Sequence, residues 1–279
     1  MRNTITFETK CWEKDWDSIL QTGYLNKQIS NCNYDFDRKL LFINNVNNLN
    51  EVKKYALLAK NEGCIDQFYV VQDYAEEALK YFGLKVDDFK GGFYYSIEEL
   101  VAIYLCKTKY LVHFSGDSIT QLGRDKSYSW INNAINLLEE RSDIAVVNPL
   151  WNYEKYDALN AEVENFNNYS IGYGFSDQCY LVRVDEFRKD IYKFKHIDSE
   201  RYPKYGGELF EKRVDSYMRC NNRLRATDMR SVYTSVNIDS KERFYKSQRI
   251  ISILQRMYGR KYHDNIHHCK KIIKKFLKK

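Results

Sequence analysis

The chain is short of the residues that break or cross-link a fold. It has only 2 prolines and 12 glycines in 279 residues, which leaves little material for long flexible linkers. Its 7 cysteines stand at irregular intervals without a Cys-X-X-Cys pair, so neither a disulfide framework nor a structural zinc site is indicated. No apolar run approaches the ~18–20 residues that span a bilayer, and residues 1–10 lack the apolar core of a secretory signal. We therefore expect a cytoplasmic location.

Charge is distributed unevenly along the chain. Residues 241–279 carry 13 Lys and Arg against 2 Asp and Glu, whereas residues 1–240 carry 31 against 36. Apolar side chains at helical spacing predict two basic amphipathic helices in this tail. Such a tail favours an anionic partner, either a membrane surface or a nucleic acid. We expect it to lie on the inner face of the membrane; packing on the body or on a second copy in a homodimer is the alternative.

Short apolar runs alternate with segments of helical spacing. The predicted strands are residues 4–9, 39–46, 67–73, 110–114 and 144–147, with one or two more between 171 and 184. The predicted helices are residues 12–20, 51–61, 75–82, 95–105, 130–140 and 208–219, and Ser96 with Glu99 fits a capping box in the fourth. Continuous apolar strands that alternate with helices predict an α/β fold with a mostly parallel sheet covered on both faces.

The most informative stretch is the predicted strand 110–114 and the Ser115-Gly116-Asp117-Ser118 that follows it. Open α/β sheets bind their ligands just beyond the carboxyl ends of their strands. A carboxylate placed there can hold a divalent cation, and the cation can hold a diphosphate. The alternative is that Asp117 only begins a turn or caps a helix. Polar side chains also end two other predicted strands, at Asn44-Asn45 and at Asp73.

These features together resemble the GT-A glycosyltransferases over roughly residues 1–220. The resemblance implies a Rossmann-like single domain, a nucleotide-sugar donor and a metal motif of the Asp-X-Asp type after the strand that ends at Phe114. Here the segment is Gly-Asp-Ser, with one acidic position absent, and a single carboxylate with waters and diphosphate oxygens still suffices for Mg²⁺ or Mn²⁺. We predict a catalytic domain over 1–240, with a nucleotide-binding half (1–120) and an acceptor-binding half (121–240), and the tail 241–279.

The resemblance also implies roles for particular residues. The candidates for holding the nucleotide-sugar are Asn44, Asn45, Asp73, Ser115, Gly116 and Asp117. Asp117 is the expected ligand for Mn²⁺ or Mg²⁺, and His196 is a candidate for a later metal ligand. For each strand-end residue the alternative is an ordinary capped loop.

An inverting glycosyltransferase also needs a carboxylate that deprotonates the acceptor hydroxyl. Glu208 follows a Gly-Gly pair at the start of a predicted helix and is the first candidate, with Asp177 and Glu211 as the others. The alternative is that Glu208 and Glu211 only complement the helix dipole. Aromatic and polar side chains around Gly172-Tyr173-Gly174 suggest an acceptor platform. Its candidate residues are Trp151, Tyr173, Phe175 and Gln178.

The sequence therefore predicts a glycosyltransferase, hexosyltransferase-like, that moves a sugar to a glycan or lipid-linked acceptor in polysaccharide biosynthesis. A nucleotidyltransferase of similar fold is one alternative, although no Gly-rich loop with Arg and Lys follows the first strand. A nucleic-acid-binding protein that uses Tyr258, Tyr262 and Phe276 of the tail is another. Because the body is net acidic and has no nucleic-acid-binding motif, we expect no nucleic acid partner.

Overall fold

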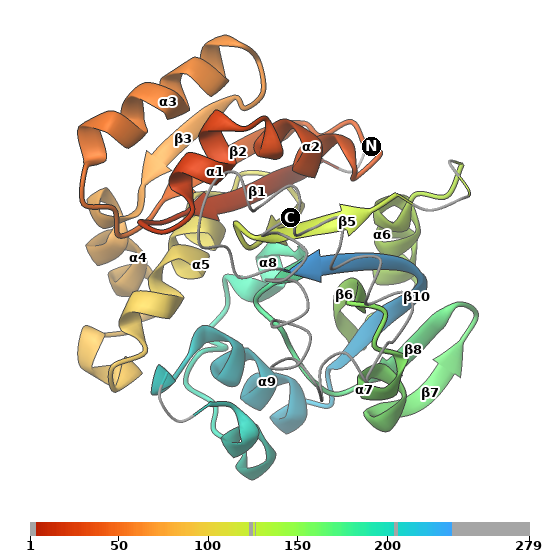
Figure 1. Ribbon diagram of the computed structural model, residues 1–279. Helices are drawn as coiled ribbons and strands as arrows, with labels where there is room; N and C mark the ends of the chain where they lie inside the picture. The colour runs from red at the N-terminus through yellow and green to blue at the C-terminus, as the bar shows by residue number, and fades with distance from the viewer. Residues whose placement is uncertain (1–3, 123–124, 126, 204–205, 236–279) are drawn as a thin grey trace, which may run out of the picture.

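The computed structural model describes residues 4–122, 125, 127–203 and 206–235 (Figure 1). The two helices predicted for 241–279 lie outside these residues. The helices are α1 (Trp16–Gln21), α2 (Tyr24–Ser30), α3 (Leu49–Asn61), α4 (Ala75–Phe82), α5 (Phe93–Leu105), α6 (Trp130–Glu140), α7 (Lys155–Asn160), α8 (Val184–Phe187) and α9 (Phe210–Cys220), with 3₁₀ turns η1 (Val71–Asp73), η2 (Val86–Phe89) and η3 (Ile197–Arg201). The strands are β1 (Ile5–Cys11), β2 (Arg38–Ile43), β3 (Gln67–Val70), β4 (Tyr110–Phe114), β5 (Ser118–Gln121), β6 (Ile144–Trp151), β7 (Glu162–Phe166), β8 (Tyr169–Gly172), β9 (Cys179–Arg183) and β10 (Leu224–Ser235).

All the strands join one sheet in the order β3-β2-β1-β4-β9-β6-β10-β8-β7, and β5 pairs with β10. The pairs β3–β2, β2–β1, β1–β4 and β6–β10 are parallel. β9 runs antiparallel between β4 and β6, so β6 and β10 point the same way as β1 and β4. The predicted α/β class with a mostly parallel central sheet is therefore confirmed.

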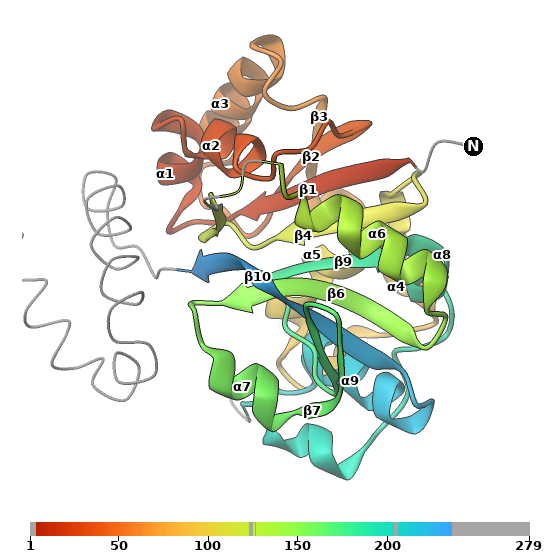
Figure 2. The ribbon, with the colours of Figure 1, turned by 90° about the vertical axis from the view of Figure 1, so that its right-hand side faces the viewer.

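Helices cover both faces of the sheet. Figure 2 shows α6 in front of the sheet and α4 and α5 behind it. One core packs under α1, α2, α3 and α6, and a second packs under α4, α5, α8 and α9. Strand residues alternate between the two: Leu41 and Ile43 enter the first core, while Leu40 and Phe42 enter the second. This burial on both faces explains why the strands read as continuous apolar runs.

Local signals set several helix boundaries. Ser129 caps the amino end of α6, because its side-chain oxygen accepts a hydrogen bond from the Asn132 amide. Gly83 ends α4 with a φ of 61°, a left-handed conformation that glycine adopts without strain. The predicted ranges 75–82, 110–114 and 130–140 coincide with α4, β4 and α6. Within the described part of the chain, no helix has both the length and the apolarity to cross a bilayer.

The predicted capping box of α5 is wrong. The helix begins at Phe93, two residues before the predicted start, so Ser96 and Glu99 lie inside it and are fully buried. The Ser96 hydroxyl instead accepts a hydrogen bond from the Phe210 amide (2.9 Å), which ties α5 to the start of α9. Glu99 turns toward Lys10 of β1. Both side chains support the region beneath the candidate site.

Candidate functional site

A cavity of about 600 Å³ opens where β1 and β4 end. It is lined by Lys10, Trp12, Lys14, Asp15, Asn44, Tyr94, Tyr95, Ser115, Gly116, Asp117, Asp177 and Gln178. The reversed direction of β9 brings its amino end to the same edge of the sheet, and the Ser115 amide donates to the Gln178 carbonyl (2.8 Å). The structure therefore brings together two of the predicted acids, Asp117 and Asp177, which lie 60 positions apart in the sequence.

A third carboxylate of this cavity, Asp15, was not predicted. It lies in the turn before α1, where its Oδ1 accepts a hydrogen bond from the Trp12 amide (2.8 Å). The lack of a side chain at Gly116 makes room for it. A Cβ on Gly116 would lie 2.8 Å from Asp15 Oδ2 and 2.7 Å from the Lys10 carbonyl. Gly116 thus allows the turn after β1 to approach the turn after β4.

The three aspartates repel one another electrostatically. Burial and, to a lesser degree, the nearby Asp177 raise the pKa of Asp117 to about 6, although a hydrogen bond from the Ser115 hydroxyl (2.9 Å) opposes the rise. Burial also raises the pKa of Asp15, and Asp117 adds to the effect. Carboxylates that line one cavity offer oxygen ligands to a cation, whose charge would favour their ionised forms.

Lys10 lines the cavity, and its charge lowers the pKa of both Asp117 and Asp15. Its ammonium pairs with Glu99 and lies 3.2 Å from Glu98 Oε2, and both glutamates are fully buried in α5. Burial alone would lower the pKa of Lys10, but Glu99, Glu98 and Asp177 raise it well above its usual value. Lys10 therefore keeps its charge at neutral pH.

Beneath Lys10, a fully buried polar group joins β1, β4 and α5. His113 Nδ1 lies 2.7 Å from Glu8 Oε2, and its ring stacks on Tyr180 with the centroids 4.7 Å apart. Burial raises the pKa of Glu8 and of Glu98 to about 8, and Glu8 Oε1 and both carboxyl oxygens of Glu98 are buried without a hydrogen bond. One ligand atom from each of Glu8, Glu98 and His113 lies within 4.8 Å of the others. The 2.7 Å contact is a hydrogen bond, so this group supports the cavity from below.

The three candidate bases lie in different environments. Glu208, the first candidate, is paired with Lys212 (3.2 Å) and Lys90 (3.6 Å). Burial would raise its pKa, but its hydrogen bond with Lys212 and both lysine charges lower it. Glu211 lies near Asp177, whose backbone hydrogen-bonds to it, and burial together with Asp177 and Glu99 raises the pKa of Glu211 to about 9. Only Asp177 lines the cavity.

The remaining candidates for nucleotide binding differ in whether they line the cavity. Asn44 is buried and lines the cavity. Asn45 is tied to the surrounding loops, because its Oδ1 accepts from Gln72 (3.0 Å) and its Nδ2 donates to the Tyr94 carbonyl (3.4 Å). Asp73 ends η1 and is not among the lining residues.

The acceptor and late-metal candidates are spread more widely. Gln178 lines the cavity, and the Ser235 hydroxyl links it to the Trp151 indole at 3.2 and 3.3 Å. Phe175 is buried in the core, and Tyr173 lies under the Arg219 guanidinium (5.1 Å). His196 stands at the start of η3, where its Nδ1 accepts from the Asp198 amide (3.2 Å), and it does not line the cavity.

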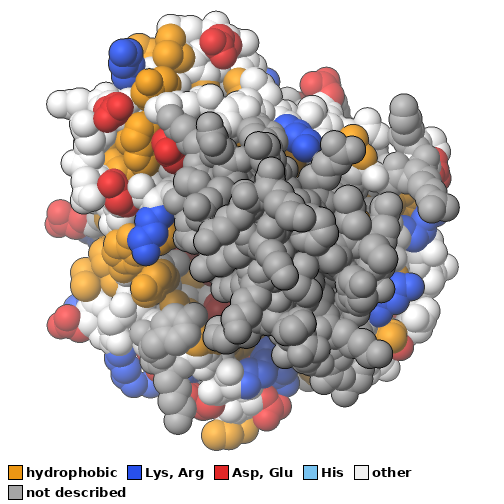
Figure 3. All heavy atoms as spheres, viewed as in Figure 1, with side chains coloured by type: hydrophobic (Ala, Val, Ile, Leu, Met, Phe, Trp, Pro, Cys, Tyr) orange, Lys and Arg blue, Asp and Glu red, His pale blue; other side chains and the backbone are white. Residues whose placement is uncertain are grey.

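The aromatic wall of the cavity comes from the first turn of α5, where Tyr94 and Tyr95 are 39% and 51% exposed. Figure 3 shows the molecule from the same side as Figure 1. Hydrophobic side chains interleaved with charged ones occupy its left part, where α4 and α5 lie in Figure 1. The sequence signal was the Phe93-Tyr94-Tyr95 cluster, of which only Tyr95 fell within the predicted helix 95–105. Two exposed tyrosines beside carboxylates and Lys14 offer flat rings for a base or a sugar.

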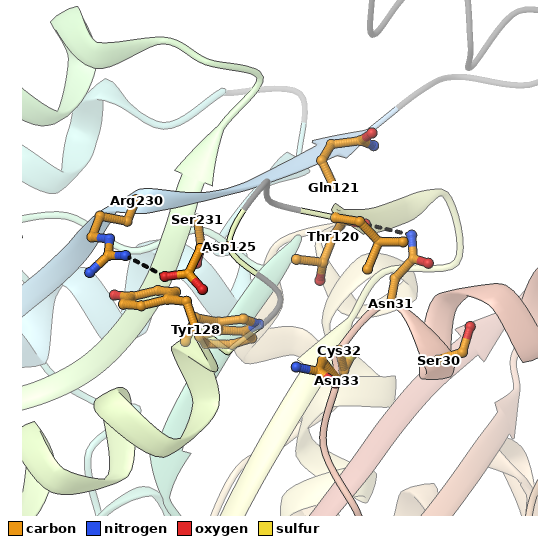
Figure 4. Close-up of a pocket in the computed structure, with 12 residues that line it drawn as sticks. Ser30, Asn31, Cys32, Asn33, Thr120, Gln121, Asp125, Tyr128, Arg230 and Ser231 are labelled. Atoms are coloured by element: carbon orange, nitrogen blue, oxygen red, sulfur yellow. Dashed lines mark hydrogen bonds and ion pairs between the residues drawn. The ribbon is translucent and has the colours of Figure 1, made fainter.

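A second hollow, of about 410 Å³, lies beside β5 (Figure 4). Arg230 forms one end of it, with its guanidinium over the Tyr128 ring (4.0 Å) and paired with Asp125 (3.1 Å). At the other end Asn31 donates to the Thr120 carbonyl (2.7 Å). None of the predicted site residues lines this hollow.

Comparisons with known proteins gave similarity at the level of structure. No family model and no curated protein sequence matches the chain. The structure is similar to glucosyl-3-phosphoglycerate synthase from Mycobacterium tuberculosis, solved with Mn²⁺, UDP and glucosyl-3-phosphoglycerate, at 14% identity and a TM-score of 0.46, over 91% of this chain and 80% of that one. It is also similar to residues 1–349 of S. aureus TarS, at 9% identity and a TM-score of 0.43, over 90% of this chain and 65% of that one.

Proposed function

We propose that the chain is a metal-dependent glycosyltransferase that uses a nucleotide-diphosphate sugar. The observation that carries this proposal is the convergence of Asp15, Asp117 and Asp177 in one cavity with two lysines and two exposed tyrosines. The cavity lies at the carboxyl ends of β1 and β4, where open α/β sheets bind nucleotides.

The donor atoms of the cavity suit a hard divalent cation. Carboxylate oxygens are the ligands that Mg²⁺ and Mn²⁺ prefer, and Asp117 and Asp15 present them from two adjoining turns. Burial, and to a lesser degree the neighbouring carboxyls, raise the pKa of both groups, and a bound cation would favour their ionised forms. A bound Mn²⁺ or Mg²⁺ would neutralise charge on the departing diphosphate. Asp15 thus replaces the acidic position that Gly-Asp-Ser lacks.

The chain's own residues supply the rest of the site. Lys14 and Lys10 place positive charge beside the expected diphosphate, and Tyr94 and Tyr95 provide faces for the base. The acceptor oxygen attacks the anomeric carbon while the bond to the diphosphate breaks, and the diphosphate leaves with the electron pair. Asp177 accepts the proton of the acceptor hydroxyl. Attack from the face opposite the diphosphate gives inversion.

A thermal-shift screen of UDP, GDP, CDP, TDP and CMP, each with and without Mn²⁺, tests the proposal. One diphosphate is expected to stabilise the full-length chain by about 2.7 kcal/mol at 100 times its dissociation constant, and only with Mn²⁺. Stabilisation by no nucleotide would contradict the proposal and favour a binding protein. Release of pyrophosphate from a nucleoside triphosphate and a sugar phosphate would indicate nucleotidyl transfer instead.

The proposed function also includes a class of acceptor and a role for the basic tail. A glycan or lipid-linked acceptor near an anionic membrane fits the charge of residues 241–279, which hold 13 Lys and Arg against 2 Asp and Glu. Each such cation adds up to about 1 kcal/mol near an anionic surface. The full-length chain is expected to sediment with vesicles that contain anionic lipid and to be released by salt. Equal binding to neutral vesicles would contradict this role of the tail.

A further inference from the structure

A groove rich in side-chain amides lies between α6 and the turn that joins β7 to β8. Its volume of about 740 Å³ falls in the ~300–1,000 Å³ range of ligand pockets, and none of its lining residues belongs to the cavity of the candidate site. Three of its asparagines share one face of α6 at helical spacing, and two form the turn, where asparagine tolerates the φ of 54° at Asn167. We call this hollow the amide groove, and its asparagines are Asn132, Asn133, Asn136, Asn167 and Asn168.

Most of these amides have no partner within the described part of the chain. Asn133 donates to the Ser129 carbonyl (3.0 Å), which ties its side chain to the start of α6. The other four asparagines are exposed, and none of their side chains has a hydrogen-bond partner among the described residues. A side-chain amide carries an acceptor oxygen and two donor hydrogens next to each other. The groove therefore presents several pairs of adjacent donors and acceptors, carried by a helix and a short turn, to whatever enters it.

Two buried polar atoms in the walls also lack a partner. Tyr169 is 6% exposed and lines the amide groove, and its hydroxyl makes no hydrogen bond with the described residues. Trp130 is 3% exposed and lines the neighbouring hollow beside β5, and its indole N–H is likewise without one. Buried polar atoms are nearly always paired in folded proteins, because an unmade hydrogen bond there costs free energy. Both atoms mark places where a hydroxyl of a ligand would complete the hydrogen bonding.

The amide groove meets the hollow beside β5. The two share Asp125, Tyr128 and Arg230 as lining residues, and Figure 4 shows Tyr128 and Arg230 together at one end of the smaller hollow. The Tyr128 hydroxyl donates to Asp228 (2.9 Å), so its ring has a fixed position where the two hollows meet. The combined surface runs from the β7–β8 turn to the end of α2, which suits an elongated ligand rather than a compact one.

The charge of this surface separates the classes of ligand. The charged residues that line it are Asp125 and Arg230, which pair with each other (3.1 Å), and Glu140. An anionic polymer such as a nucleic acid needs unpaired cations, and these lining residues include none. A lipid surface or an apolar peptide needs a contiguous apolar patch, whereas amides and hydroxyls predominate in the amide groove. The surface therefore fits a neutral polar chain.

We propose that the amide groove binds a neutral glycan chain, which continues past Tyr128 to the hollow beside β5. A sugar hydroxyl both donates and accepts hydrogen bonds, so neighbouring hydroxyls match the adjacent donors and acceptors of an amide. The rings of Tyr128, Trp130 and Phe166 offer apolar area to the C–H faces of the sugars. Glycan binding at this groove does not depend on the transferase activity, whereas the identity of the bound chain as acceptor or product rests on the proposed function.

Binding of the labelled full-length chain to immobilised oligosaccharides tests the groove. The panel holds neutral oligomers of glucose, galactose, mannose and N-acetylglucosamine in several linkages, with uronic-acid and sulfated oligomers as the anionic set. A neutral oligomer should bind, with an affinity that salt does not weaken. Asn132→Ala combined with Asn136→Ala should lower that affinity by about tenfold or more. The matched control is Asn61→Ala, the same change at the exposed last residue of α3, which should bind as the wild type does.

The unliganded melting temperature separates a binding role from a structural one. Alanine favours a helix more than asparagine does, and the two α6 side chains have no described partner to lose. The double variant should therefore melt at the wild-type temperature or above it. Tyr169→Phe removes only an unpaired hydroxyl and should also melt no lower than the wild type, yet it should weaken glycan binding.

The inference fails if no neutral oligomer binds, or if the double variant and Tyr169→Phe bind as tightly as the wild type. It also fails if the anionic set binds in preference and salt releases it, which would indicate a surface for polyanions. Neutral binding that Asp177→Asn removes, and that the groove variants keep, would place the glycan in the cavity instead. UDP with Mn²⁺ should bind the groove variants as it binds the wild type, so a wild type that binds glycan but no nucleotide would reject the proposed function alone.

Discussion

Asp117→Asn is expected to abolish metal-dependent binding of the nucleoside diphosphate. The substitution keeps the shape of the side chain and the oxygen that accepts from Ser115, but it removes the charge that a divalent cation requires. We expect the dissociation constant for the diphosphate with Mn²⁺ to rise at least 100-fold, measured by calorimetry. The weak affinity that remains should no longer depend on Mn²⁺.

The control for this variant is Asp190→Asn, which removes an exposed carboxylate whose ion pair among the described residues is with Lys193. It should bind the nucleotide as the wild type does. Because burial and Asp177 disfavour the ionised form of Asp117, Asp117→Asn should not melt below the wild type. A variant that melts normally and still binds with Mn²⁺-dependent affinity would refute the assignment of Asp117.

Asp177→Asn is expected to lower kcat by about 10²–10⁴-fold, the usual contribution of a general base. Glu211→Gln should cost less than about tenfold, because the pKa of Glu211 is near 9 and its carboxyl is already neutral at pH 7.5. The measurement is release of the nucleoside diphosphate under saturating donor and acceptor. The opposite ranking, with Glu211→Gln the more damaging, would make Glu211 the base.

The raised pKa of Glu211 also predicts how the enzymatic activity depends on pH. Glu211 holds its proton below a pH of about 9 and loses it above, where a second negative charge then stands beside Asp177. Activity of the wild type should therefore fall above pH 9. Glu211→Gln cannot ionise and should keep its activity there. An alkaline limb that persists in Glu211→Gln would show that another group causes it.

The sequence predicted the part of the site that lies on one continuous segment. Asp117 could be found because it follows an uninterrupted apolar strand, and strand ends are recognisable from local pattern. Asp15 could not be found as a site residue, because the helical spacing of residues 12–20 placed it inside a predicted helix. In the structure that helix begins at Trp16, and Asp15 belongs to the turn before it.

The support beneath the cavity was not predictable for a different reason. Glu98 and Glu99 are polar residues at positions of α5 that local pattern assigns to a cap or to solvent. They are buried because Lys10, 89 positions before Glu99, meets them from β1. A pairing over that distance depends on which strand lies beside the helix, and short-range periodicity carries no such information.

The buried carboxyls beneath the cavity link folding to proton uptake. Glu8 and Glu98 have pKa values of about 8 and Glu99 about 7, against 4.5 for each when freely hydrated. Between pH 4.5 and about 8, these carboxyls keep protons in the native chain that the unfolded chain has released. The free energy of unfolding therefore decreases as the pH rises through this range. Mild acid therefore favours the native state of this chain, and the stability that these three carboxyls contribute is lost by about pH 8.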